Sequence, residues 1–250
     1  MINCLTALST FIQRKVNSWP RSGHPCITCL ATTREPGLCP DCAADLPRNS
    51  LACRRCALPL VSPGVVVGDE LCGRCLTSPP DFEATVAPWL YGFPVNQLIS
   101  GFKFGGHRAY GRPLAEMLAT ELEAGIIDRP SCLIPVPMHR QRLQARGFNQ
   151  AEDIALWLSD RLGIPVCTDI VRRRRETSAQ SGLNRRQRLQ NLRGAFEVDS
   201  SVPDHVAIVD DVMTTGATVQ QMARALRRVG AARVQVWALA RTPQVPEHAM

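Results

Sequence analysis

The chain has 250 residues, of which 45% are hydrophobic and 20% are charged, and its formal net charge is +7. This composition is typical of a globular protein with one ordinary domain and a small additional module. No apolar stretch approaches the roughly 20 residues of a membrane span. Arg14 and Lys15 do not precede an apolar core, so no signal peptide is expected. We therefore expect a cytoplasmic protein without a membrane span.

Eight of the eleven cysteines form four Cys-x-x-Cys pairs. Each pair can form a knuckle that directs two thiolates at one ion, and two knuckles complete a tetrahedral zinc site. Because the segment has few large apolar residues, it needs metal or disulfides in place of a core, and disulfides are the weaker explanation without a secretory signal. We predict two structural zinc sites rather than iron–sulfur or redox sites. The predicted ligands are Cys26, Cys29, Cys39, Cys42, Cys53, Cys56, Cys72 and Cys75.

The pairing of the four knuckles is open at this point. Sequence order would place the first four cysteines at one ion and the last four at the other. An interleaved arrangement would satisfy the same ligand count.

After a break at residues 78–81, strand patterns and helix patterns alternate along the chain. Strands are expected at residues 84–91, 132–136, 165–171, 195–198, 206–209 and 233–239. Helices are expected at residues 94–104, 112–122, 148–162 and 218–229, and residues 137–147 are expected to form a loop. Such alternation predicts a mostly parallel sheet with a ligand at the carboxyl ends of its strands.

The most specific motif is V-A-I-V-D-D-V-M-T-T-G-A-T-V at residues 206–219. The apolar run brings Asp210 and Asp211 to the edge of the sheet, and backbone N–H groups of residues 214–218 can surround a phosphate at a helix N-terminus. The carboxylates are too close to that phosphate to bind it, and they suit sugar hydroxyls and Mg²⁺. The segment therefore predicts a sugar-phosphate ligand. A simple helix cap is the less specific alternative.

This motif resembles the phosphoribosyl-pyrophosphate (PRPP) motif of type I phosphoribosyltransferases. The resemblance implies that Asp210 and Asp211 hold the ribose hydroxyls and act in catalysis. It also implies a loop that binds pyrophosphate, for which residues 138–147 fit, and a flexible closing loop, for which residues 172–192 fit. The implied ligands of the 5′-phosphate are Thr214, Thr215, Gly216, Ala217 and Thr218.

Arginines are concentrated in both of these loops. Eight lie between Arg172 and Arg193 against one acidic residue, so this segment accounts for the net charge of the chain. Arginine forks can neutralise a departing pyrophosphate without a proton transfer. The sequence does not rank Arg140, Arg142 and Arg146; Arg140 and Arg146 are included in the predicted site, and a solvated loop is the alternative for each.

Further motifs resemble the ComF/GntX family over about residues 26–242, in addition to the knuckles and the Asp-Asp segment. They are K-F-x-G, P-V-P, R-G-F-N-Q-A, R-x-x-x-T-x-x-Q and R-x-x-N-x-x-x-A-F. The matching residues are Lys103, Phe104, Gly106, Pro135, Val136, Pro137, residues 146–151, Arg173, Thr177, Gln180, Arg188, Asn191, Ala195 and Phe196.

The resemblance implies an α/β fold, with a type I phosphoribosyltransferase-like parallel sheet, helices on both of its faces and a small N-terminal zinc-ribbon module. The expected organisation is an N-terminal extension at residues 1–22, a double zinc-ribbon module at 23–78, a phosphoribosyltransferase-like domain at 82–242 and a tail at 243–250.

Members of the family are associated with natural competence, with use of external DNA as a nutrient and, in the GntX branch, with gluconate uptake. In one hypothesis PRPP and Mg²⁺ bind, a nucleobase or other nucleophile attacks C1′ and pyrophosphate leaves. In the other, the chain senses PRPP without catalysis, or holds single-stranded DNA or a competence helicase. The few aromatic residues disfavour a stand-alone DNA binder, and the lack of a recognisable base-selecting hood disfavours a standard nucleobase enzyme.

Overall fold

A computed structural model describes the chain except for residues 1–22, 61–69, 126–127, 175–193, 199–200 and 244–250. The chain divides after Ala44 into two compact units, and each is described by itself. The expected N-terminal extension, most of the expected closing loop and nearly all of the expected tail lie outside the described residues. No helix in the described ranges is long and apolar enough to cross a membrane.

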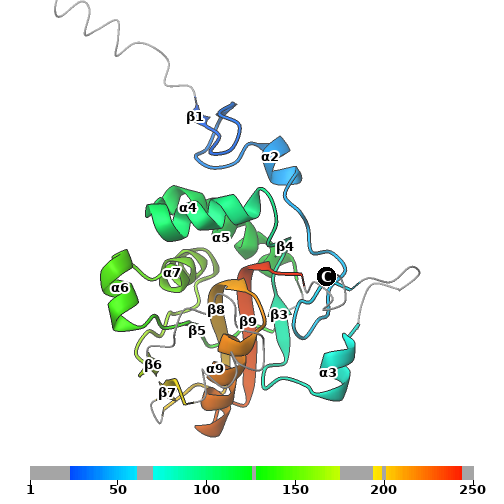
Figure 1. The fold of residues 1–250 in the computed structure, drawn as a ribbon, viewed down its shortest axis with the longest axis vertical. Coiled ribbons are helices and arrows are strands. Elements are labelled where there is room, and N and C mark those ends of the chain that lie inside the picture. The colour runs from blue at the N-terminus through cyan, green and yellow to red at the C-terminus, as the bar shows by residue number, and fades with distance from the viewer. Residues whose placement is uncertain (1–22, 61–69, 126–127, 175–193, 199–200, 244–250) are drawn as a thin grey trace, which may run out of the picture. The chain divides into compact units, whose positions relative to one another are not determined.

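The larger unit, from Asp45 onward, is built on a parallel sheet with the strand order β3-β9-β8-β5 (Figure 1). The strands are β3 (Ala84–Val86), β5 (Cys132–Pro135), β8 (His205–Met213) and β9 (Arg233–Arg241), and β4 (Trp89–Leu90) also pairs with β9. All of these pairings are parallel, which confirms the predicted sheet. The central pair, β8 and β9, runs in register from His205–Arg233 to Met213–Arg241.

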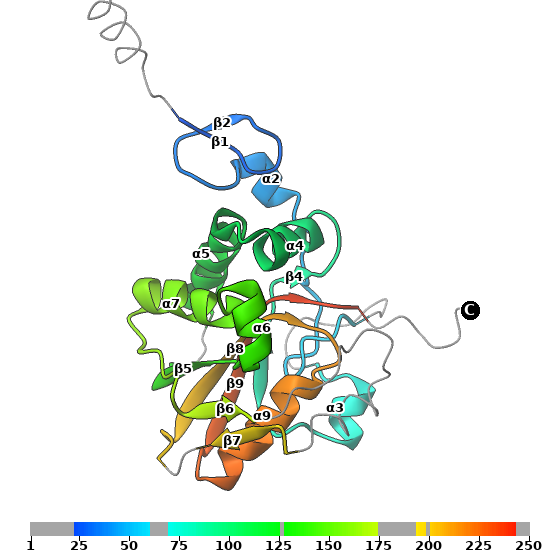
Figure 2. The ribbon, with the colours of Figure 1, turned by 60° about the vertical axis from the view of Figure 1, so that its left-hand side comes forward.

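Helices cover both faces of the sheet, because its central strands are apolar on both sides. On one face, α9 (Ala217–Arg228) packs Met222 and Leu226 into the same core as Val206 and Ile208 of β8. On the other face, α5 (Arg108–Ala124) and α7 (Gln150–Leu162) pack together, and α7 also contacts β5 and β8. Figure 2 shows α9 and α7 on different sides of β8 and β9. The fold is the type I phosphoribosyltransferase-like architecture expected from the sequence.

Two segments differ from the expectation. Residues 137–147, expected as a loop, contain the helix α6 (Arg140–Arg146), because most of its residues are good helix formers and Gly147 ends it in a left-handed conformation. The expected strand at residues 165–171 is only partly formed: Val166 makes an isolated parallel bridge to Leu133 of β5. Its end belongs to β6 (Val171–Arg173), which pairs antiparallel with β7 (Phe196–Val198) outside the main sheet.

The helix α4 (Val95–Gly105) has the expected apolar face, with Val95, Leu98, Ile99 and Phe102 buried. Gly106 follows it with a φ of 63°, a left-handed conformation that glycine adopts at low cost. This explains the glycine of the K-F-x-G motif.

The smaller unit is described from Gly23 to Ala44. It contains the antiparallel strands β1 (His24–Pro25) and β2 (Thr32–Thr33), followed by the helix α2 (Pro40–Ala44). Its buried residues are Cys26, Thr33, Gly37 and Cys39. A unit with so few buried side chains has no aliphatic core, which fits the prediction that metal replaces one.

Candidate functional site

The eight knuckle cysteines gather into two clusters in sequence order, and the interleaved arrangement does not occur. Within each cluster the sulfur atoms all lie within 4.8 Å of one another, which fits four thiolates around one zinc ion. The first cluster consists of Cys26, Cys29, Cys39 and Cys42, and the second cluster of Cys53, Cys56, Cys72 and Cys75.

The second cluster is part of the core of the larger unit. Its four cysteines are buried together with Val206, Ile208 and residues of α9. The two knuckle carbonyls of Arg54 and Arg55 accept hydrogen bonds from Thr85 of β3, at 3.0 Å from its N–H and 2.7 Å from its hydroxyl. The next two, of Cys56 and Ala57, accept from Arg241 Nε at 3.0 Å and from Asn49 Nδ2 at 2.9 Å.

The predicted acidic pair lies within the carboxyl end of β8. Asp210 Oδ1 accepts a hydrogen bond from the N–H of Asp211 at 2.9 Å, and Asp211 Oδ1 accepts one from the N–H of Val212 at 2.6 Å. The other oxygen of Asp211 forms an ion pair with Lys103 Nζ of α4 at 2.9 Å. Lys103 belongs to the K-F-x-G motif, but no local sequence pattern indicated that it would lie in this site.

The two carboxyl groups differ in their electrostatics. Burial, together with the charge of Asp211, raises the pKa of Asp210 from 3.8 to about 7, although Lys103 opposes the change. Burial by itself would lower the pKa of Lys103, but the charges of Asp211 and Asp210 leave it raised. Asp211 is therefore the paired carboxylate, whereas Asp210 carries charge that a bound cation or hydroxyl donor would stabilise.

The predicted phosphate loop connects β8 to α9. Thr214, Thr215 and Gly216 precede the helix, whereas Thr218 belongs to its first turn. Gly216 has a φ of 75°, a left-handed conformation that glycine adopts at low cost, so the tight turn favours glycine. The N-terminus of α9, a helix of 12 residues, follows directly and favours an anion.

A cavity of ≈ 300 Å³ joins these elements, at the lower end of the range for small-molecule sites. Its lining includes Asp210, Asp211, Thr214 and Thr218 of the predicted site. The cationic side chains that line it are Lys103, Arg142, Arg146 and Arg173. Because these cations outnumber the two carboxylates, the cavity suits a ligand with several negative charges.

The predicted arginines are not equivalent. Arg146 lines the cavity, whereas Arg140 is exposed at the start of α6 and is not among its lining residues. Arg142, which the sequence did not separate from its neighbours, lies on the cavity side. A helix in place of the expected loop explains the difference, since residues two positions apart on a helix face different directions.

The R-G-F-N-Q-A motif connects α6 to α7 and forms part of the cavity wall. Arg146 Nη1 donates to Gln150 Oε1 at 2.6 Å, and Gln150 is buried. Asn149 caps α7 by accepting from the N–H of Ala151 at 3.2 Å, and its amide donates to the carbonyl of Val136 at 3.1 Å. The Phe148 ring packs against Phe102 at 5.6 Å between centroids. The motif thus orients Arg146 toward the cavity.

Phe104 of the K-F-x-G motif also lines the cavity, although no role was predicted for it. Its side chain is 78% exposed, whereas Phe102, two residues earlier in α4, is fully buried. The guanidinium carbon of Arg146 lies 5.1 Å from the centroid of the Phe104 ring. The helical period already placed Phe102 on the apolar face and Phe104 off it, but it did not show that a cavity lies there.

Comparisons with known proteins agree with this architecture. The phosphoribosyl transferase domain model matches residues 146–249, and the double zinc ribbon domain model matches residues 19–76. The DNA utilization protein YhgH of Salmonella typhimurium is 35% identical over 211 residues, covering 82% of this chain and 91% of that protein. The chain belongs to the ComF/GntX family. Another relative, competence protein F of Haemophilus influenzae, is 34% identical over 232 residues, covering 86% of this chain and 96% of that protein.

A more distant family member has a similar name. Competence protein ComFC of Streptococcus pneumoniae is 28% identical over 156 residues, covering 62% of this chain and 67% of that protein. The ComF/GntX chain therefore combines a phosphoribosyltransferase domain with a double zinc ribbon, and its two cysteine clusters are the zinc sites that such a ribbon requires.

Proposed function

We propose that this ComF/GntX chain binds PRPP with Mg²⁺ in the cavity at the carboxyl end of β8. The observation that carries the proposal is the convergence of three features on one cavity. An acidic pair, the loop before α9 and four cationic side chains all border it. In one PRPP molecule, the acidic pair would hold the ribose diol, the loop would hold the 5′-phosphate, and the cationic side chains would hold the pyrophosphate.

In this proposal Asp210 and Asp211 hold the ribose hydroxyls and the metal, and residues 214–218 hold the 5′-phosphate. Arg142 and Arg146, with Lys103 beside them, face the pyrophosphate. The C1′–oxygen bond to pyrophosphate breaks, a bond from C1′ to the acceptor forms, and the acceptor loses a proton to solvent. The chain contributes by stabilising the positive C1′ with carboxylates and the leaving group with cations. Arg140 has a weaker case than Arg142, because it does not line the cavity.

The acceptor in this proposal is a nucleobase that stacks on Phe104. An exposed ring beside a cavity offers a planar apolar surface, and aromatic stacking tolerates every base. Two relatives are named for DNA utilization and for competence. We extend that association to this chain and infer a role in the use of bases from DNA.

The test is calorimetric titration of the zinc-loaded chain with PRPP and Mg²⁺. Saturable binding is expected, and the double variant Asp210→Asn/Asp211→Asn should lose it. Asp128→Asn is the matched control, because this carboxylate pairs with Arg233 and does not line the cavity. Absence of binding to the folded wild-type chain would refute the proposal.

The transfer step is tested separately by measuring pyrophosphate release with a panel of free bases. Phe104→Ala should raise the base concentration needed for half-maximal rate about 5- to 150-fold, the range for loss of one stacking contact. PRPP affinity should fall by a much smaller factor in this variant, because only the contact between the Phe104 ring and Arg146 connects the ring to the pyrophosphate side. If PRPP binds but none of the bases in the panel causes release of pyrophosphate, a sensing role is the better description.

Single-stranded DNA is the second candidate ligand, favoured by the exposed Phe104 ring beside four cationic side chains. Such binding should weaken steeply as salt rises, because counterions are released. It should also weaken in Arg142→Gln and Arg146→Gln, whereas Asp210→Asn should not weaken it. A flat salt dependence would exclude this function.

A further inference from the structure

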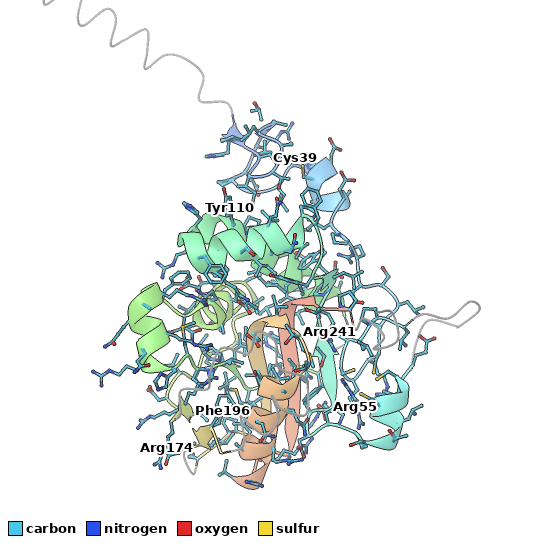
Figure 3. The ribbon with its side chains drawn as sticks, viewed as in Figure 1. Cys39, Arg55, Tyr110, Arg174, Phe196 and Arg241 are labelled. Atoms are coloured by element: carbon cyan, nitrogen blue, oxygen red, sulfur yellow. The ribbon has the colours of Figure 1, made fainter. Side chains whose placement is uncertain are left out.

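Arg241 is a fully buried arginine at the carboxyl end of β9, where Figure 3 labels it. Its Nε donates to the carbonyl of Cys56 in the second cluster at 3.0 Å. Its Nη1 donates to the carbonyl of Met213 at 2.9 Å, to that of Thr214, and to that of its own neighbour Thr242 at 2.7 Å. One guanidinium therefore joins a zinc knuckle to the end of β8 and to the first residue of the phosphate loop.

A buried guanidinium is costly unless opposite charge compensates it. Arg241 Nη2 is buried without a hydrogen-bond partner, so the carbonyls do not satisfy the group completely. Four thiolates around one divalent ion carry a net charge of about −2. The second cluster is therefore the electrostatic partner of Arg241.

Arg233, at the opposite end of the same strand, shows what an ordinary structural arginine does here. It is partly exposed and pairs with Glu83 at 3.0 Å and with Asp128 at 2.8 Å. Surface pairs of this kind contribute little to stability. Arg241 instead donates hydrogen bonds to backbone carbonyls of separate segments. Its Nε binds the carbonyl of Cys56, whereas its Nη1 binds that of Met213 at the end of β8.

We propose that Arg241 is a positioning residue that couples the second cysteine cluster to the phosphate loop. Zinc at Cys53, Cys56, Cys72 and Cys75 holds the knuckle carbonyl and the counter-charge in place. Arg241 in turn holds the carbonyls of Met213 and Thr214, from which the loop starts. Metal binding at the second cluster and anion binding at residues 214–218 then stabilise one another. The anion part of this inference rests on the proposed function, and the metal-to-loop part does not.

The first measurement is zinc transfer to a chromogenic chelator under native conditions. Arg241→Met should release zinc from the second cluster faster than the wild-type chain does, by about 5- to 150-fold, the usual range of a coupling between sites. Release from the first cluster should not change. Cys42→Ser, which removes a ligand of the first cluster only, identifies which kinetic phase belongs to which site. Arg233→Met is the matched control and should match the wild type.

The second measurement is amide hydrogen exchange without any ligand. Exchange at residues 214–218 should rise in Arg241→Met and less in Arg241→Lys, which keeps the charge but not the fork. Exchange in the middle of β8 and β9 should rise by a smaller factor, which measures the lower stability of the whole unit. An equal rise throughout the sheet would mean that Arg241 only stabilises the fold, and an unchanged loop would also overturn the proposal.

The third measurement adds PRPP and Mg²⁺ to the zinc-release assay. Reciprocity requires that a ligand at the loop slows release from the second cluster only. If calorimetry detects PRPP binding but zinc release is not slowed, the coupling is wrong and the proposed function stands. If PRPP does not bind, the proposed function fails, and the exchange measurement still decides whether the second cluster positions the loop.

Discussion

The two cysteine clusters share one local design and differ in their surroundings. In each, the residue after the first Cys-x-x-Cys pair has a left-handed backbone without being glycine: Leu30 with a φ of 65° and Ala57 with a φ of 52°. Each donates its N–H to the carbonyl of the first cysteine, Cys26 at 3.0 Å and Cys53 at 2.7 Å. Yet Leu30 is 75% exposed, whereas Ala57 is 2% exposed.

This contrast shows that a metal knuckle can be either a separate element or part of a core. The Cys26–Cys29 knuckle of the first cluster is supported within its own unit, where the N–H of Ile27 donates to the carbonyl of Gly37. The Cys53–Cys56 knuckle of the second cluster has four consecutive carbonyls, those of residues 54–57, bound by groups of the larger unit. Loss of metal from the second cluster should therefore destabilise the whole larger unit, whereas loss of metal from the first cluster should affect only the smaller unit.

The largest expected effect separates the clusters directly. Cys56→Ser should lower the free energy of unfolding of the larger unit by more than about 3 kcal/mol, because a core site loses its metal. Cys29→Ser should change that quantity by less than about 0.5 kcal/mol. Denaturant unfolding followed by the buried Trp89 and Trp237 measures both. Similar losses in the two variants would contradict the contrast.

A smaller effect is expected from the arginine that connects the second cluster to β8. Arg241→Met should destabilise the larger unit by about 2–4 kcal/mol, because several buried carbonyls lose their donor. Arg233→Met, on the same strand, should cost less than about 1 kcal/mol. Thermal unfolding of the two variants gives the comparison. Equal shifts would show that the link to the second cluster has no special role.

The acidic pair belongs to the larger unit and allows a pH test of that unit alone. The pKa of Asp210 is raised by burial to about 7 from 3.8, so the native state binds more protons than the unfolded state between these values. This contribution to stability is complete below pH ~4 and is lost as pH rises through about 7. Asp210→Asn should thus be more stable than the wild type at pH 8, by on the order of 1–2 kcal/mol.

The difference between Asp210→Asn and the wild type should shrink as the pH falls toward 4. Comparing variant and wild type at each pH removes the pH dependence of zinc binding, which both share. Unfolding curves at four pH values would be sufficient. A difference that does not change with pH would mean that Asp210 ionises normally.

The smallest expected effect concerns the left-handed residues themselves. Leu30→Gly should slow zinc release from the first cluster by up to about 5-fold, because glycine relieves a left-handed backbone that costs about 1 kcal/mol. Ala57→Gly should be close to neutral, since the same relief is offset by a lost buried methyl group worth about 0.8 kcal/mol. Chelator competition measures both. Slower release in Ala57→Gly alone would contradict this reasoning.

Much of the candidate site follows from local sequence patterns. The apolar run, the two carboxylates and the Thr-Thr-Gly-x-Thr loop predicted a strand, a turn and a helix N-terminus, and β8, Gly216 and α9 have that order. The predicted parallel sheet is confirmed for the same reason, because alternating strands and helices leave few topologies. The Cys-x-x-Cys spacing is also a local pattern, and it identified the eight cysteines of the two clusters.

Other parts of the site depend on residues far apart in sequence. Lys103 pairs with Asp211 only because the end of α4 lies beside the end of β8. The sequence also gave no sign that Arg142 faces the cavity and Arg140 does not, since that depends on a helix that was expected to be a loop. No local pattern distinguishes such partners, because contacts across the sheet are set by packing.

The sequence by itself determined the metal ligands' spacing, the strand–loop–helix unit and the family to which the chain belongs. Only the tertiary structure decided that the second cluster lies in the core of the larger unit and that Arg241 joins it to the phosphate loop. The reason is physical: a knuckle forms from bonds within a few residues, whereas a buried charge finds its partners only when distant segments pack together.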